Sequence, residues 1–245
     1  MIKAVLFDYG GTLVSPKRPW DKVILDATLS LHELMTDYGL RMGPQSFVGL
    51  NNSIFRRYAL IEEKENRDVA DVIKYRELVD ALFPDGQEAW RSRVADEANE
   101  RFWRMAMANW MVRQNARASL ERLEVLGLKM AIVSNHQNPD LPRQLEEFGL
   151  ARYFSSVVTS MREGTRKPDK RIFEKSLSLL HMHPEEAIFV GDSLKHDIAG
   201  AKSVGMRSIL IADGTSIDLT GEVRPDYIVR DLDEIPPILA SLSLS

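Results

Sequence analysis

Carboxylates, a lysine and a serine stand just after short apolar segments of this 245-residue chain. A carboxylate can act as a nucleophile, and two carboxylates can hold a hard divalent cation such as Mg²⁺. An ammonium and a hydroxyl can neutralise or hydrogen-bond the oxygens of a phosphoryl group during transfer. The four polar clusters that carry these groups are Asp8-Tyr9-Gly10-Gly11-Thr12, Ser134-Asn135-His136, Lys167-Pro168, and Gly191-Asp192-Ser193 with Asp197.

Together these groups predict phosphoryl transfer. Asp8 would attack phosphorus and form an aspartyl phosphate, which water then resolves. Asp8 and Asp192 would hold Mg²⁺. Lys167 would neutralise the transferring oxygens, and Ser134 would donate a hydrogen bond to them.

The elements that must position these groups follow from the hydrophobic pattern. Short apolar runs predict strands that alternate with amphipathic helices, which is typical of an α/β fold with a parallel sheet and helices on both faces. Each polar cluster would then lie at the carboxyl end of a strand, where open α/β sheets bind ligands. The predicted strands are residues 2–7, 129–133, 156–159, 187–190, 207–211 and 227–229, and the predicted helices of this part cover about 116–126, 141–148, 170–181, 193–204 and 235–242.

Residues 15–109 have a different pattern. Apolar side chains recur at spacings of three and four, which predicts four helices, with the third beginning at a capping Asp68. The sequence therefore predicts a discontinuous α/β domain, residues 1–14 and 110–245, with an all-α domain, residues 15–109, inserted after the first strand.

Composition limits the class of protein. The formal net charge is −4, which argues against a dedicated nucleic-acid-binding protein. There is no cysteine, which excludes disulfides and thiolate chemistry. The first apolar run is too short for a signal peptide, and no run approaches the ~18 apolar residues that a membrane span needs. We expect a cytoplasmic enzyme that acts on a small phosphorylated molecule and contacts neither nucleic acid nor a membrane.

The four clusters, in this order and each after a predicted strand, resemble the motifs of the haloacid dehalogenase superfamily. The resemblance covers the α/β part of the chain, and the helical insert resembles the mobile cap of many members, which closes over the site and selects the substrate. The matching segments are Val5-Leu6-Phe7-Asp8-Tyr9-Gly10-Gly11-Thr12, Ala131-Ile132-Val133-Ser134-Asn135, Arg166-Lys167-Pro168, and Val190-Gly191-Asp192-Ser193-Leu194-Lys195-His196-Asp197.

The resemblance implies a role for each motif residue. Asp8 is the expected nucleophile, and Mg²⁺ would be held by Asp8, the Gly10 carbonyl and Asp192. Asp197 would orient Lys167 or a metal-bound water. Binding of the substrate's phosphoryl group would fall to Thr12, Ser134, Asn135 and Lys167.

One position departs from the family pattern. Most phosphatases of this superfamily carry a general acid–base aspartate two residues after the nucleophile, and this chain has Gly10 there. General acid–base catalysis is worth ~10²–10⁴-fold. His136, whose imidazole titrates near neutrality when unperturbed, is a candidate replacement.

Gly10 also leaves other chemistries open. Dehalogenases and phosphonatases of the superfamily lack that aspartate too, so either activity is an alternative. A phosphonatase needs a lysine in the cap for a Schiff base, and nothing singles out one of the available lysines. A further alternative is a catalytically weakened member that binds phosphate or a partner protein. The lysines available in the insert are Lys17, Lys22, Lys64 and Lys74.

Overall fold

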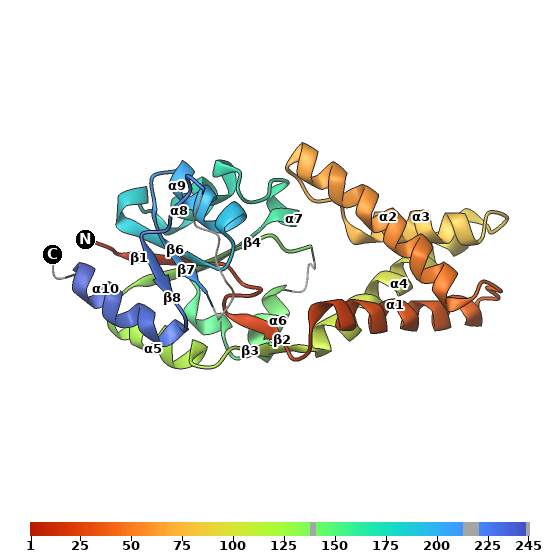
Figure 1. Cartoon of the computed structure of the whole chain (residues 1–245), viewed down its shortest axis with the longest axis horizontal. Coiled ribbons are helices and arrows are strands. Elements are labelled where there is room, and N and C mark those ends of the chain that lie inside the picture. The colour runs from red at the N-terminus through yellow and green to blue at the C-terminus, as the bar shows by residue number, and fades with distance from the viewer. Residues whose placement is uncertain (138–140, 213–220, 244–245) are drawn as a thin grey trace. The chain divides into compact units, whose positions relative to one another are not determined.

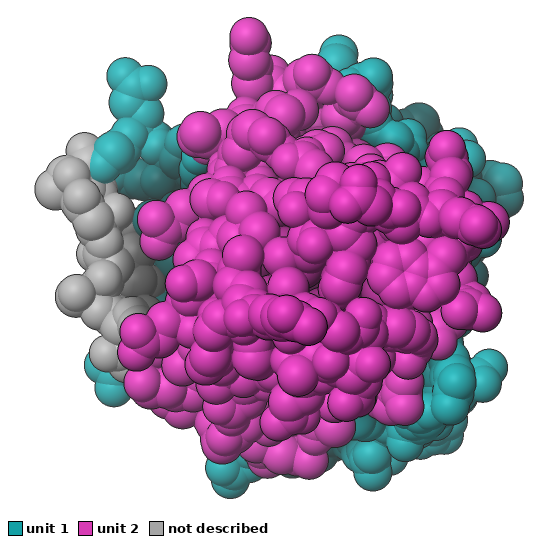
Figure 2. Space-filling view, turned by 90° about the vertical axis from the view of Figure 1, so that its right-hand side faces the viewer, with its two compact units in different colours: residues 1–15, 112–245 teal, residues 16–111 magenta. Residues whose placement is uncertain are grey.

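The computed structural model describes residues 1–137, 141–212 and 221–243 (Figure 1). The chain divides into two compact units, which Figure 2 colours separately. Unit 1 comprises Met1–Ser15 and Val112–Ser245, and unit 2 comprises Pro16–Met111. None of the helices in the described part of the chain is both long and apolar enough to cross a membrane.

Unit 1 is built on a six-stranded sheet of order β5-β4-β1-β6-β7-β8, in which every pair is parallel. The central strand β1 (Ala4–Phe7) is apolar and fully buried, as expected for a parallel strand covered on both faces. It pairs with β4 (Lys129–Ser134) on one side and β6 (Ala187–Gly191) on the other. The outer strands are β5 (Ser156–Thr159), β7 (Arg207–Ile211) and β8 (Tyr227–Val229).

Helices cover both faces of this sheet, which confirms the predicted α/β class. Helices α8 and α9 lie over one face and α5 and α10 over the other (Figure 1). The Asp169 carboxylate caps α8 by accepting a hydrogen bond from the Arg171 amide at 2.9 Å. The α-helices of unit 1 are α5 (Ala116–Val125), α6 (Leu141–Glu147), α7 (Ser160–Glu163), α8 (Lys170–Leu180), α9 (Ala199–Ser203) and α10 (Ile235–Ser243).

The segment after β6 differs from the sequence prediction. A single helix was expected over 193–204, but the chain forms a π-helical segment, Leu194–Ile198, followed by the short α9. The Ser193 hydroxyl caps this segment by accepting from the His196 amide at 3.2 Å. Single-turn π segments are often found at functional sites. The described residues of unit 1 also form three 3₁₀ turns, at Ala151–Tyr153, Pro184–Glu186 and Leu232–Glu234.

Unit 2 consists of four helices around one apolar core, in which Leu31, Phe47, Tyr75 and Leu78 are fully buried. Helix α3 begins at Asp71 with Ala70 in the capping position, so the predicted cap at Asp68 is wrong by two residues. A two-stranded sheet, β2 (Val14–Pro16) with β3 (Trp110–Val112), was not predicted. The helices are α1 (Trp20–Asp37), α2 (Pro44–Glu65), α3 (Asp71–Leu82) and α4 (Glu88–Ala108).

Candidate active site

The polar clusters of unit 1 meet where strand order reverses. The chain order of the strands runs outward from β1 in both directions, so the carboxyl ends of β1, β4 and β6 border one crevice. Asp8 directly follows β1, and its amide donates to the Val190 carbonyl at 2.9 Å. Ser134 ends β4, and Asp192 directly follows β6. The sheet therefore brings together groups that are far apart in the sequence.

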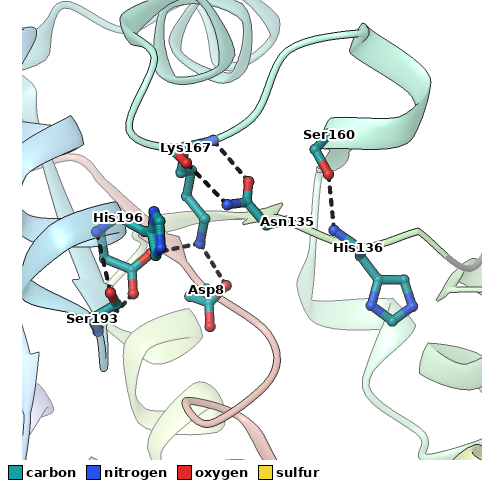
Figure 3. Close-up of polar contacts among 8 residues, drawn as sticks. Asp8, Asn135, His136, Ser160, Lys167, Ser193 and His196 are labelled. Atoms are coloured by element: carbon teal, nitrogen blue, oxygen red, sulfur yellow. Dashed lines mark hydrogen bonds and ion pairs between the residues drawn. The ribbon is translucent and has the colours of Figure 1, made fainter. Parts of the chain in front are cut away.

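Lys167 is the centre of the cluster. Its Nζ donates to Asp8 Oδ1 at 2.6 Å (Figure 3). The same Nζ donates to Asp197 Oδ1 at 2.6 Å, and the Lys167 side chain is 2% exposed. Burial lowers the pKa of Lys167, but the Asp197 and Asp8 carboxylates outweigh that effect and raise it above its ordinary value. Lys167 therefore carries a fixed positive charge beside the Asp8 carboxylate.

Asn135 and Asp197 hold Lys167 in place. The Lys167 amide donates to Asn135 Oδ1 at 2.7 Å, and Asn135 Nδ2 donates to the Lys167 carbonyl at 3.0 Å (Figure 3). The second Asp197 oxygen accepts from the Ser193 amide at 2.9 Å. The Asn135 amide group is thus engaged with the main chain of Lys167, where the resemblance had implied a contact with substrate. The Lys167–Pro168 peptide bond is cis.

Three carboxylates suit a divalent cation. Asp8, Asp192 and Asp197 each have an oxygen within 4.8 Å of the others. Burial raises the pKa of Asp8 to about 6 against the opposing effect of Lys167. Desolvation and the nearby charges of Asp8 and Asp197 raise the pKa of Asp192 to about 7. Three acidic side chains share the single positive charge of Lys167, and a hard cation would supply the further positive charge that the set needs.

Both Asp197 oxygens already accept hydrogen bonds, from Lys167 and from the Ser193 amide. Asp8 and Asp192 are therefore the carboxylates best suited to hold an ion.

The Gly10–Gly11 loop has the geometry to add a main-chain ligand. Gly10 forms a bridge with Val14, in which the Gly11 amide donates to the Val14 carbonyl at 2.8 Å and the Val14 amide donates to the Tyr9 carbonyl at 3.1 Å. In a trans peptide the carbonyl points opposite to the following amide. The Gly10 carbonyl therefore points away from Val14 and stays outside the bridge.

Two glycines make room for the carboxylates. Gly11 has φ +86°, and a Cβ there would lie 2.2 Å from Asp192 Oδ2. A Cβ on Gly191 would lie 2.4 Å from Asp197 Oδ2. Both positions need glycine because the main chain touches an acidic side chain. The sequence contains both glycines within its motifs, but no local signal predicts which carboxylate each one faces.

Ser134 and Thr12 are both buried at this edge of the sheet. Ser134 is 3% exposed and pairs in register with Thr159 of β5. Thr12 is fully buried, and among the described residues nothing hydrogen-bonds its hydroxyl. Because β4 also pairs with β1, Ser134 at the end of β4 lies beside the end of the strand that Asp8 follows.

His136 borders the site through Tyr9. Its amide donates to Ser160 Oγ at 3.0 Å (Figure 3), and its ring meets the Tyr9 ring edge-on with centroids 5.8 Å apart. Burial lowers the pKa of His136 to about 4. A neutral imidazole cannot donate a proton as a general acid at pH 7. Tyr9, whose hydroxyl donates to Gln144 Oε1 at 2.7 Å, was not recognised as part of this environment from the sequence.

A parallel α/β sheet with an aspartate after β1, a buried lysine and two further acids after β6 defines a class of hydrolases. Residues 45–211, more than half of the chain, match the haloacid dehalogenase-like hydrolase family. The chain therefore belongs to that family, as its motifs predicted.

Two curated relatives illustrate the range of that family. The haloacid dehalogenase-like hydrolase domain-containing protein 3 of Xenopus laevis is 35% identical over 134 residues, covering 55% of this chain and 54% of that protein. The glyceraldehyde 3-phosphate phosphatase of Pyrococcus furiosus is 34% identical over 126 residues, covering 51% and 52%. The chain thus spans about half the length of the curated relatives it matches.

Solved structures match over nearly the whole chain. A 2-haloacid dehalogenase from Pseudomonas syringae has a TM-score of 0.80 at 26% identity, covering 99% of this chain and 100% of that one. A phosphatase of the same superfamily from Thermococcus onnurineus has a TM-score of 0.66 at 26% identity, covering 97% and 98%. The similar proteins therefore include both phosphatases and dehalogenases.

Proposed function

We propose that this protein is a magnesium-dependent phosphatase that hydrolyses a small phosphorylated metabolite through an aspartyl phosphate on Asp8. One observation carries the proposal: Lys167 is buried between Asp8 and Asp197, and a third acid, Asp192, has an oxygen within 4.8 Å of theirs. A fixed ammonium next to the nucleophile suits a dianionic substrate, because the phosphoryl oxygens need positive charge in the transition state.

Each residue has a defined task. An Asp8 carboxylate oxygen forms a bond to phosphorus, and the leaving oxygen departs with the electron pair of the broken ester bond. Lys167 and Ser134 hold the phosphoryl oxygens. Water then attacks the same phosphorus, which releases inorganic phosphate and restores the Asp8 carboxylate.

The proposed magnesium site consists of Asp8, the Gly10 carbonyl and Asp192. When bound, Mg²⁺ would supply positive charge against the phosphoryl oxygens. Asp197 and Asn135 act through Lys167: the first accepts from its ammonium and the second holds its main chain. We assign both as positioning residues.

Gly10 restricts the range of good substrates. Without an acid two residues after Asp8, the leaving oxygen takes its proton from water, and His136 is neutral at pH 7 because burial holds its pKa at about 4. The rate then depends steeply on the basicity of the leaving group. We expect rapid hydrolysis of aryl or acyl phosphates and slow hydrolysis of alkyl phosphates such as sugar phosphates.

Dehalogenation is the second candidate function. Gly10 and the similarity to the Pseudomonas syringae dehalogenase structure favour it. In that reaction Asp8 would attack carbon and halide would leave with the bonding electrons. The acid cluster favours the phosphatase instead, since carbon chemistry of this kind needs no divalent cation.

Of the lysines considered for the Schiff base of a phosphonatase, the most buried is Lys74, and it is already paired. Lys74 is 4% exposed, and its Nζ lies 2.8 Å from Glu62 Oε1 and 2.9 Å from Asp71 Oδ1. The Lys74 Nζ is thus engaged in two buried ion pairs within unit 2, whereas a Schiff-base lysine must offer a free amine to the substrate carbonyl. Lys74 is therefore a structural cation of unit 2 and no Schiff-base nucleophile.

The test is release of nitrophenol from p-nitrophenyl phosphate, with Mg²⁺ or with excess chelator, compared with chloride release from a 2-chloro carboxylic acid. We expect magnesium-dependent phosphate ester hydrolysis that Asp8→Asn reduces to background while the fold persists. The matched control is Asp233→Asn, an exposed aspartate of the same unit, which leaves the rate unchanged.

Each other outcome points to a different function. Chloride release that persists in chelator would replace the phosphatase by a dehalogenase. Absence of both reactions, with phosphate still bound, would indicate a member that binds its ligand without turning it over. Full phosphatase activity in Asp8→Asn would refute covalent catalysis through Asp8.

A further inference from the structure

Arg113 contacts the loop that carries the first motif. It is the first residue after β3, and it is partly buried. Its guanidinium Nη1 donates to the Gly11 carbonyl at 2.5 Å, and its own amide donates to the Leu13 carbonyl at 3.0 Å. No motif predicted this contact, which joins residues separated by about a hundred positions in the sequence.

The contact matters because Gly10 and Gly11 form the most flexible kind of peptide segment. Glycine loses more conformational freedom on folding than any other residue. Gly11 has a left-handed conformation, with φ +86°. This conformation is set by the orientation of the two peptide planes that meet at its Cα. The hydrogen bond from the Gly11 amide to Val14 holds the first plane, and the Arg113 guanidinium holds the second.

The orientation of these two planes determines the positions of two proposed ion ligands, the Gly10 carbonyl and the Asp192 carboxylate. The first plane contains the Gly10 carbonyl, whose direction is opposite to that of the Gly11 amide. The Gly11 Cα lies against the Asp192 carboxylate, since a Cβ there would meet Asp192 Oδ2 at 2.2 Å. The two planes meet at the Gly11 Cα, so movement of the Gly11–Thr12 plane would shift this Cα against Asp192 and strain the hydrogen bond to Val14 that orients the Gly10 carbonyl.

We propose that Arg113 is a positioning residue, which fixes the Gly10–Gly11 loop and so sets the affinity of this site for a divalent cation. This inference rests on the proposed magnesium site. Groups that orient the ligands of a metal commonly contribute ~10–100-fold to its affinity. Arg113 would act on the ion through the main chain, with no contact to substrate.

The test measures Mn²⁺, as a probe for Mg²⁺, by calorimetric titration of the full chain. In Arg113→Met we expect Mn²⁺ to bind ~10-fold or more weakly. The Mg²⁺ concentration for half-maximal hydrolysis of p-nitrophenyl phosphate should rise by the same factor. At saturating Mg²⁺ the limiting rate and the substrate KM should stay within about twofold of wild type, because only ligand orientation has changed.

Arg117→Met is the matched control. Arg117 also donates to a main-chain carbonyl, that of Phe148, but it is exposed on α5. We expect its Mn²⁺ affinity to equal that of wild type. Should Arg113→Met fail to fold, Arg113→Lys decides: lysine keeps the charge without the planar guanidinium, and we expect a partial loss of Mn²⁺ affinity.

The outcomes separate the two proposals. Wild-type protein that binds no Mn²⁺ would overturn both the magnesium site and the role of Arg113. Wild-type binding with unchanged affinity in folded Arg113→Met, or in Arg113→Lys where the methionine variant does not fold, would overturn the role of Arg113 alone. A fall in limiting rate with unchanged Mn²⁺ affinity would likewise contradict positioning of the ion ligands.

Discussion

Lys167→Met removes the buried positive charge of the site while nearly conserving side-chain volume. The ammonium is 2% exposed and lies 2.6 Å from a carboxylate oxygen of both Asp8 and Asp197. Removing one partner of a buried ion pair leaves an uncompensated charge and costs about 3–5 kcal/mol. Because domains have unfolding free energies of about 5–15 kcal/mol, we expect a folded variant with markedly reduced stability and background turnover.

The assay is urea denaturation at pH 7.5 in chelator, with Lys202→Met as the matched control. Lys202 lies at the same distance, 2.6 Å, from Asp226, but the two side chains are 37% and 32% exposed. Exposed ion pairs contribute about 0–1 kcal/mol. Equal losses of unfolding free energy in Lys167→Met and Lys202→Met would refute the reasoning, since Lys167 is buried between two carboxylates and Lys202 forms one exposed pair.

The pH dependence of the loss has a defined sign. Burial raises the pKa of Asp8 to about 6, and Lys167 opposes that rise. In Lys167→Met the pKa of Asp8 in the folded state rises further, so the folded chain holds a proton that the unfolded chain has released. The stability that this proton confers is lost as pH rises through the folded-state pKa. The gap between wild type and variant should therefore be smaller at pH 5 than at pH 8; a gap that is constant or shrinks with pH would contradict this account.

Three further predictions concern single residues. Gly10→Asp restores the usual acid–base group and should raise sugar phosphate turnover by up to ~10²–10⁴-fold; a folded, magnesium-binding variant without gain would mean that the proton comes from elsewhere. His136 has a pKa of about 4 when folded and ~6.5 when unfolded, so it removes up to ~3 kcal/mol of stability as pH falls from 6.5 to 4. His136→Gln should lose less stability than wild type between pH 7.5 and pH 4.5 in urea titrations, and an imidazole that titrates near 6.5 by NMR would contradict this. Gly191→Ala places a Cβ 2.4 Å from Asp197 Oδ2, which displaces the carboxylate from Lys167 and should cost about 10²-fold in p-nitrophenyl phosphate turnover; unchanged turnover would contradict it.

The sequence was sufficient to predict the parallel sheet and the edge of that sheet at which the polar groups lie. Short apolar runs such as β1 are buried on both faces, and this local property is visible in composition alone. Because parallel strands have their carboxyl ends at one edge of the sheet, an aspartate or serine that follows a strand can be placed at that edge from the sequence. Asp8, Ser134 and Asp192 were placed in this way, and the family followed from the order of their motifs.

Boundaries and irregular segments were less predictable. The π-helical segment at Leu194–Ile198 has the apolar spacing of an ordinary helix, so the pattern could not separate it from α9. Helix α3 begins at Asp71 although Asp68 is a good capping residue, and the Val69 amide donates to Glu62 Oε1 of α2, a contact that no local pattern reports. Strands β2 and β3 are three residues each, too short for any periodic signal.

The sequence by itself determined which residue types stand at the ends of the strands. Only the tertiary structure decided which side chains meet: Lys167 with Asp8 across 159 positions, Gly11 with Asp192, and Arg113 with the Gly11 carbonyl. Hydrophobic periodicity reports the neighbours of a residue within its own helix or strand. Contacts between separate loops depend on how the sheet orders its strands and on atomic packing, and neither is encoded within a local window of sequence.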